Sequence, residues 1–108
     1  MTTGWIYLLL AGVFEIGFTT SMRYLDWSLK LVPLAIFLVC SILSFTLLIA
    51  AIKTVPLGTA YAVWTGVGTA GTAVVGFAYY GEQATTLRLV FLVLLIASIA
   101  GLKAVSAE

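Results

Sequence analysis

The chain has 108 residues, of which 63% are hydrophobic and 8% charged, with five basic and four acidic side chains and no histidine. Its mean hydropathy of +1.21 corresponds to more apolar surface than a soluble domain of this size can bury. The composition therefore excludes a soluble globular protein and points to a membrane protein.

Four apolar stretches follow one another along the chain, and each has about the ~20 residues that a helix needs to cross the hydrocarbon layer. They cover residues 4–22, 33–52, 57–80 and 87–105. The connections between them are too short to fold as a soluble domain. The sequence thus predicts an all-α membrane protein, with residues 1–108 forming a single domain of four transmembrane helices. No basic segment precedes the first stretch, which we therefore expect to be retained and not cleaved as a signal peptide.

The first stretch contains a single acidic residue, Glu15, near its centre. A charged side chain at that depth costs ~2.5–3.5 kcal/mol even on the milder insertion scale. No basic residue lies within two turns to pair with it, so we expect this carboxyl to hold a proton when empty and to exchange it for a cation. The alternative is a protonated glutamate that only joins helices.

Residues three or four positions from Glu15 share its helix face. Gly12 leaves space beside the carboxylate for a ligand or for a closely packed helix. Thr19 has a hydroxyl that reaches either the carboxylate or, as is more common in membrane helices, a carbonyl of its own helix. In the second stretch Cys40 is the only cysteine, so no disulfide forms within the chain.

The third stretch carries Tyr61 and Trp64, three residues apart on one helix face. Aromatic rings attract a desolvated cation with ~2 kcal/mol. The alternative is a belt of aromatic side chains at the membrane interface, which fits the rings near the helix ends better than Trp64. Those rings belong to Trp5, Tyr7, Trp27, Tyr79 and Tyr80.

Small residues recur in the third and fourth stretches. The segment "GVGTAG", residues 66–71, matches a dinucleotide fingerprint only formally, because it follows no strand and lies inside an apolar helix. Gly66 and Gly68 instead weaken the helix locally, as alternating access would require. A ridge at steps of four predicts close helix packing and comprises Gly58, Ala62, Gly66 and Ala70. Ala97 and Gly101 give the fourth stretch the spacing of an assembly helix.

Basic residues almost balance across the membrane, with three on one side and two on the other. Arg23, Lys30 and Arg88 flank the first and third connections, whereas Lys53 and Lys103 lie on the opposite side. Because basic residues set orientation, this balance predicts insertion in both orientations and antiparallel pairing. The alternative is simply a short chain with few charges. The remaining acids, Asp26, Glu82 and Glu108, are expected to be solvated.

The segments "AGVFEIG", "PLGTAYAVWTGVGTAG" and "GLK" together resemble the small multidrug resistance transporters over the whole chain. This resemblance implies antiparallel dimers in the bacterial inner membrane that exchange protons for organic cations. It assigns Glu15 as the carboxylate for proton and substrate, with Tyr61 and Trp64 lining the site. Gly12 lies beside the glutamate, and Ser44 matches a hydrogen-bonding serine of the second helix.

The subtype signals are mixed. "AVWTGVGTAG", Ser44 and Lys103 resemble the guanidinium exporters, in which a tryptophan usually stands where this chain has Phe18. "TTSM", residues 19–22, resembles exporters of quaternary ammonium and aromatic cations, which usually have a tyrosine where this chain has Ser41. The third stretch and its "GEQ" ending also resemble members that act as half of a heterodimer. We expect export of guanidinium or small guanidinyl cations, with broad quaternary ammonium export as the alternative.

Two other classes remain open on the sequence alone, a cation channel without proton coupling and a non-transporting structural subunit. An enzyme is not expected, because there is no histidine and no second acid or nucleophile accompanies Glu15. The expected partners are a second, antiparallel copy or a homologous chain, the organic cation, protons and the lipid bilayer. We expect no cofactor, no metal and no nucleic acid.

Overall fold

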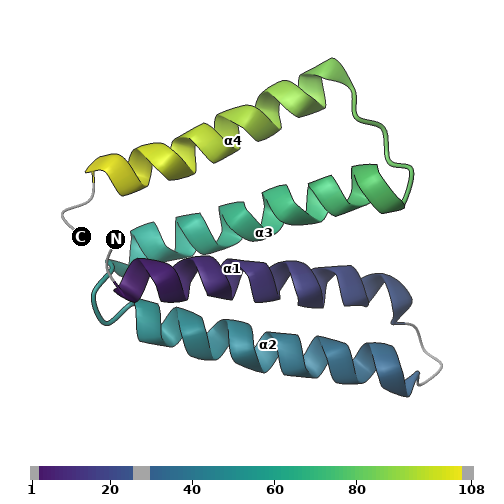
Figure 1. Ribbon diagram of the computed structural model, residues 1–108, viewed down its shortest axis with the longest axis horizontal. Coiled ribbons are helices and arrows are strands. Elements are labelled where there is room, and N and C mark those ends of the chain that lie inside the picture. Colours follow the sequence, from purple (N-terminus) through teal and green to yellow (C-terminus); the bar gives the residue numbers. More distant parts are fainter. Residues whose placement is uncertain (1–2, 26–29, 106–108) are drawn as a thin grey trace.

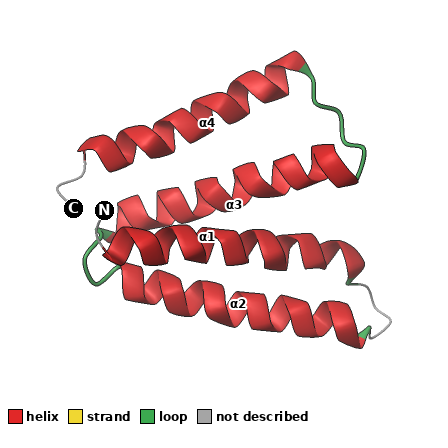
Figure 2. Cartoon of the chain, in the orientation of Figure 1, coloured by secondary structure: helices red, strands yellow, loops and turns green. Residues whose placement is uncertain are grey.

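The computed structural model describes residues 3–25 and 30–105, so the expectations for Asp26, Trp27 and Glu108 lie outside the described residues. Four α-helices follow in chain order, with a short 3-10 helix η1 (Met22–Tyr24) after the first (Figure 1). They are α1 (Thr3–Ser21), α2 (Leu31–Ala51), α3 (Leu57–Tyr79) and α4 (Thr86–Val105). The described part of the chain contains no strand (Figure 2). The predicted all-helical class is confirmed.

Three of the described helical segments are long and apolar enough to cross a membrane, namely Thr3–Tyr24, Leu31–Ala51 and Thr86–Val105. The exception is α3, which has 23 residues and no charged side chain but includes five glycines and four threonines. These small and polar residues lower its hydropathy. They also allow another helix to approach closely, and α1 packs against α3 at its glycines.

The central helix of the arrangement is α1, which packs against α2 on one side and α3 on the other (Figure 1). At the edge, α4 lies against α3 alone among the described helices, and in the view of Figure 1 the two diverge from the C-terminal end of α4 toward its start. Glycines make the contact of α1 with α3 close. A Cβ at Gly12 would lie 2.5 Å from Cγ1 of Val67, and one at Gly71 would overlap Ile16.

The hydrophobic core lies mainly toward the end of the bundle where α1 begins. Leu8, Val55 and Val63 are fully buried there. Trp5 belongs to the same core with 1% exposure, so its prediction as an interfacial aromatic residue is wrong. The reason is that α1 begins against the α2–α3 connection, where a Cβ on Gly4 would meet Val55. The Lys103 ammonium lies 5.2 Å from the centroid of the Trp5 ring.

The predicted small-residue ridge packs over only half of its length. A Cβ at Gly66 would lie 2.8 Å from Cδ1 of Ile99 on α4, and Ala70 is also buried. By contrast, nothing lies within 4 Å of a Cβ at Gly58, and Ala62 is exposed. The other half of the ridge is therefore uncovered in the described part of the chain.

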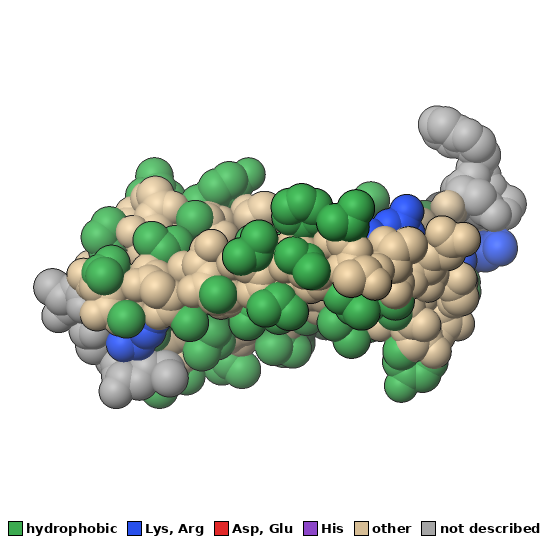
Figure 3. Space-filling view, turned by 90° about the horizontal axis from the view of Figure 1, so that it is seen from above, with side chains coloured by type: hydrophobic (Ala, Val, Ile, Leu, Met, Phe, Trp, Pro, Cys, Tyr) green, Lys and Arg blue, Asp and Glu red, His purple; other side chains and the backbone are tan. Residues whose placement is uncertain are grey.

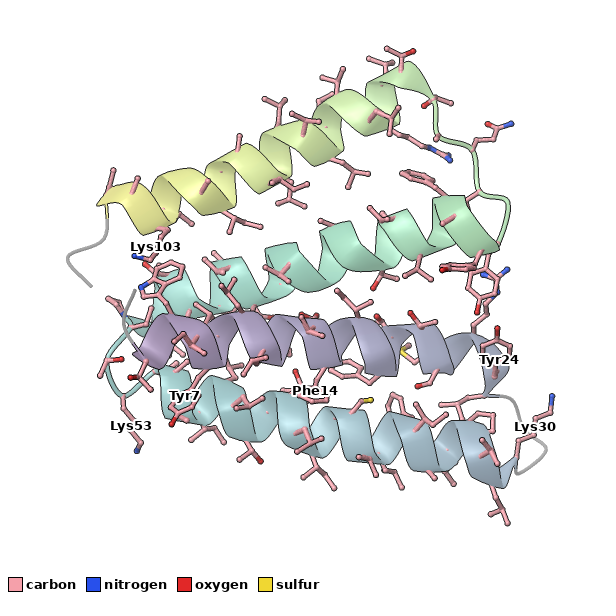
Figure 4. The ribbon with its side chains drawn as sticks, in the orientation of Figure 1. Tyr7, Phe14, Tyr24, Lys30, Lys53 and Lys103 are labelled. Carbon is pink, nitrogen blue, oxygen red and sulfur yellow. The ribbon has the colours of Figure 1, made fainter. Side chains whose placement is uncertain are left out.

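The outer surface of the bundle is strongly apolar. No described residue of α4 is buried, and its exposed side chains include Phe91, Leu94 and Ile96. Figure 3 shows hydrophobic side chains over the middle of the visible face, with Lys and Arg side chains near the two ends. Lys53 and Lys103 lie at one end of the bundle and Lys30 at the other (Figure 4). This distribution suits a bilayer around the middle of the helices.

Candidate functional site

The Glu15 carboxyl is buried between α1 and α3, with 9% of the residue exposed. Gly68 makes this position possible, because a Cβ there would overlap the carboxyl group. Within the described part of the chain, Oε1 of Glu15 is buried without a hydrogen-bond partner. Such a group is costly to leave unpaired and so requires a proton or a ligand.

A cavity of about 310 Å³ opens beside this carboxyl. Its lining is more polar than the membrane-facing surface and comprises Glu15, Thr19, Gly68, Thr69, Thr72, Ala73 and Glu82. The volume lies at the lower end of the range typical of small-molecule sites. The cavity therefore suits a small polar ligand.

Thr19 bonds to its own helix and to α3. Its hydroxyl lies 2.8 Å from the carbonyl oxygen of Glu15 and 2.6 Å from the hydroxyl of Thr72. The sequence had left open whether this hydroxyl reaches the carboxylate or a carbonyl of α1, and the structure shows the carbonyl. The Thr19–Thr72 pair joins the two helices at the cavity wall and leaves hydroxyl lone pairs for a donor.

A second polar contact joins three helices on the other side of α1. The Trp64 indole Nε1 donates to Oγ of Ser44 over 2.9 Å, and that hydroxyl donates to the carbonyl oxygen of Ala11 over 2.6 Å. Ser44 is fully buried and Trp64 is 7% exposed. The indole is thereby held in one orientation.

Aromatic rings extend from Trp64 in both directions. The Trp64 ring lies 5.7 Å from that of Tyr61 and 5.3 Å from that of Phe45, between centroids. Phe45 in turn stacks on Phe18 at 6.1 Å, and Phe18 meets Phe37 edge-on at 6.0 Å. Phe18 therefore lies on the α2 side of α1, and Phe45 lies between its ring and that of Trp64.

The predicted site residues fall into two groups. Glu15, Thr19 and Gly68 line the cavity. The second group takes part in the aromatic and polar contacts that join α1, α2 and α3, and comprises Tyr61, Trp64, Ser44 and Phe18. Within this group, Tyr61 is 57% exposed.

The two remaining predicted residues, Gly12 and Gly66, act in helix packing. Gly12 lies against Val67. The prediction that Gly66 supports the site is wrong, because in the described part of the chain this residue faces Ile99 on α4 and not the cavity. Its position two residues before Gly68 turns it to a different face of α3.

Sequence reasoning missed four residues of the cavity wall, which are Thr69, Thr72, Ala73 and Glu82. Thr72 follows Gly68 by four positions and so shares its helix face, a signal that was present in the sequence. Glu82 was expected to be a solvated connection residue. Its side chain is 51% exposed in the α3–α4 connection, as expected. Gly81, with φ of +67°, also turns the chain back so that the Glu82 N–H donates to the Gly76 carbonyl over 3.1 Å.

A family model described as Small Multidrug Resistance protein matches residues 3–95. The chain belongs to the small multidrug resistance family. Proteins named guanidinium exporter from Salmonella typhimurium strain LT2 and from Citrobacter freundii are each 42% identical to it over 99 residues. One from Escherichia coli K12 is 41% identical. Each of these alignments covers 92% of this chain and 94% of the relative.

Membership of the small multidrug resistance family confirms the resemblance deduced from the sequence motifs. The family consists of small membrane transporters that move organic cations, and these relatives are bacterial. The protein is accordingly a multi-pass transporter of a bacterial plasma membrane, and its helices have the length and hydropathy that this location requires.

Proposed function

We propose that the protein exchanges protons for guanidinium or small guanidinyl cations at Glu15. The observation that carries the proposal is the buried Oε1 of Glu15, which has no hydrogen-bond partner among the described residues and faces a small polar cavity. A bare carboxylate is costly in such a place. The group is neutral with a proton or paired with a cation, and the two states exclude one another.

The polar lining favours a cation that carries N–H groups. A guanidinium ion presents donors in a planar fork that matches the two oxygens of a carboxylate. Its remaining N–H groups can donate to hydroxyl oxygens of Thr19, Thr69 or Thr72, which line the same cavity. A quaternary ammonium ion has no such donors and binds chiefly to aromatic faces. The rings of Tyr61 and Trp64 do not line this cavity, so broad quaternary ammonium export remains the second candidate.

A second chain is needed to complete the pathway. The exposed apolar side chains of α4 and the near balance of Lys and Arg across the membrane support an antiparallel second copy. A homologous partner chain with a fixed orientation is the alternative. In either dimer the two carboxyls compete for one substrate, which gives alternating access a common site.

The names of the relatives support the choice of substrate, since proteins about 42% identical are named guanidinium exporter. We propose no enzymatic reaction for this chain. Cation binding and proton exchange are assigned to Glu15, whereas the cavity of the single chain does not support the binding role predicted for Tyr61 and Trp64, because its lining lacks both rings. Gly12, Phe18, Thr19, Ser44 and Gly68 support these roles by packing and hydrogen bonding.

The direct test is proton release from detergent-solubilised protein on addition of guanidinium, phenylguanidinium, tetramethylammonium and tetraphenylphosphonium. Guanidinium and phenylguanidinium should each release protons, and the Glu15→Gln variant should release none with any cation. Release by tetraphenylphosphonium alone would favour the quaternary ammonium alternative. Transport without proton release would instead indicate a channel, and the absence of both would indicate a structural subunit.

A further inference from the structure

A guanidinium group of the chain itself lies beside Glu82, which lines the Glu15 cavity. At the end of the bundle marked by Tyr24 in Figure 4, Nη1 of Arg23 is 3.9 Å from Oε2 of Glu82. The Cζ atom of the same guanidinium lies 3.8 Å from the centroid of the Tyr80 ring. The Tyr24 and Tyr80 hydroxyls are hydrogen-bonded to each other, which fixes the ring beneath the guanidinium.

Glu82 connects this contact to the inner site. It lines the same cavity as Glu15, and its carboxyl lies over the last turn of α3, where a Cβ on Gly76 would be 2.6 Å from it. The backbone bond from Glu82 to Gly76 holds it there. A cation bound at Glu82 is therefore at the wall of the cavity that leads to Glu15.

The contact of Arg23 with Glu82 is well suited to exchange. Both side chains are about half exposed, at 48% and 51%, and the separation of 3.9 Å is too long for a hydrogen bond. Exposed pairs of this kind contribute little and are easily broken. The other nearby guanidinium, that of Arg88, donates to the Gln83 carbonyl over 2.9 Å and so does not take the place of Arg23.

We propose that Glu82 and the Tyr80 ring form an outer binding subsite for guanidinyl cations, which Arg23 occupies until an entering substrate displaces it. The inference rests on the proposed function, because it assumes a substrate of the same chemical class. A carboxylate beside a ring face binds a planar guanidinium by pairing and stacking together. A quaternary ammonium ion lacks the donors for the carboxylate, so the subsite selects for guanidinyl cations before they reach Glu15.

The test uses the full-length Glu15→Gln protein, in which the inner carboxylate is absent. Phenylguanidinium is titrated while the amide NMR signals of Tyr80 and Glu82 are followed. Both signals should shift and saturate, and tetramethylammonium should move them much less. Adding Arg23→Gln should tighten the apparent dissociation constant about twofold to fivefold, since the internal competitor is removed. Adding Glu82→Gln should abolish saturation.

Arg88→Gln is the matched control, because it removes the same charge from the neighbouring segment and should tighten binding less than Arg23→Gln. If the amide signals of Tyr80 and Glu82 did not shift in the Glu15→Gln protein, the subsite would be overturned. A change in the same direction for Arg23→Gln and Glu82→Gln would also overturn it, since a purely structural ion pair predicts that result. Proton release by the wild type is measured separately, so failure of the subsite is distinguishable from failure of the proposed function.

Discussion

Replacing Ser44 by alanine should release the Trp64 indole. The Ser44 hydroxyl accepts from Nε1 of Trp64 over 2.9 Å and donates to the Ala11 carbonyl over 2.6 Å, in a fully buried position. A hydrogen bond between membrane helices is worth ~0.6 kcal/mol on average and ~1.7 at most. An unpaired buried donor costs ~1–3 kcal/mol. We therefore expect Ser44→Ala to lower the free energy of unfolding by about 1–2 kcal/mol.

The assay is reversible unfolding by SDS in mixed micelles, followed by far-UV circular dichroism. Ser98→Ala is the control, because the Ser98 hydroxyl is exposed and donates to the Leu94 carbonyl of its own helix. It should change the unfolding free energy by less than about 0.5 kcal/mol. In a double-mutant cycle, Trp64→Phe should cost little once Ser44 is alanine. Equal losses for Ser44→Ala and Ser98→Ala, or additive losses for Ser44 and Trp64, would refute the reasoning.

Three further predictions address the carboxyl, the aromatic rings and the orientation. Gly68→Ala should reduce guanidinium exchange, because its Cβ would overlap the Glu15 carboxyl. The control Gly58→Ala should preserve exchange, since that Cβ would meet nothing within 4 Å. Equal exchange rates of the two variants in liposomes would contradict this prediction. Phe18→Trp enlarges the ring that stacks on Phe45, which in turn contacts Trp64. Uptake should shift toward guanidinium over phenylguanidinium, and an unchanged ratio would exclude Phe18 as a selectivity determinant. Two or three lysines added on one side of the membrane should fix the orientation and lower activity, with recovery on co-expression of an oppositely biased copy. A wild type labelled in only one orientation would point to an obligate heterodimer.

The sequence predicted the features that depend on composition and helical periodicity. Long apolar stretches and one central acid were enough to identify the helical membrane class and to single out Glu15. The sequence also limited the hydrogen-bond partners of the Thr19 hydroxyl to two, the Glu15 carboxylate and a carbonyl of its own helix, because hydrogen bonds within a helix follow from residue spacing. The family motifs then identified Ser44 as a hydrogen-bonding residue of the second helix, and the structure shows that its partners are Trp64 and the Ala11 carbonyl.

Features that depend on how helices meet could not be predicted. Gly66 and Gly68 are two residues apart, and only the packing shows that the first faces α4 and the second faces Glu15. Trp5 near a helix end reads as an interfacial residue, yet the α2–α3 connection covers it. Glu82 required the positive φ of Gly81 to bring it back over α3, and the sequence alone does not fix that turn.

The most direct test of the central claim measures guanidinium-driven proton movement in proteoliposomes, with the wild type compared to Glu15→Gln. The amide keeps the shape of the side chain but cannot exchange a proton. With the wild type, an outward guanidinium gradient should acidify the lumen, because protons enter as guanidinium leaves. The folded, monodisperse Glu15→Gln protein should match protein-free liposomes. Coupled exchange by Glu15→Gln at the wild-type rate would contradict the assignment of Glu15 as the shared site of proton and cation.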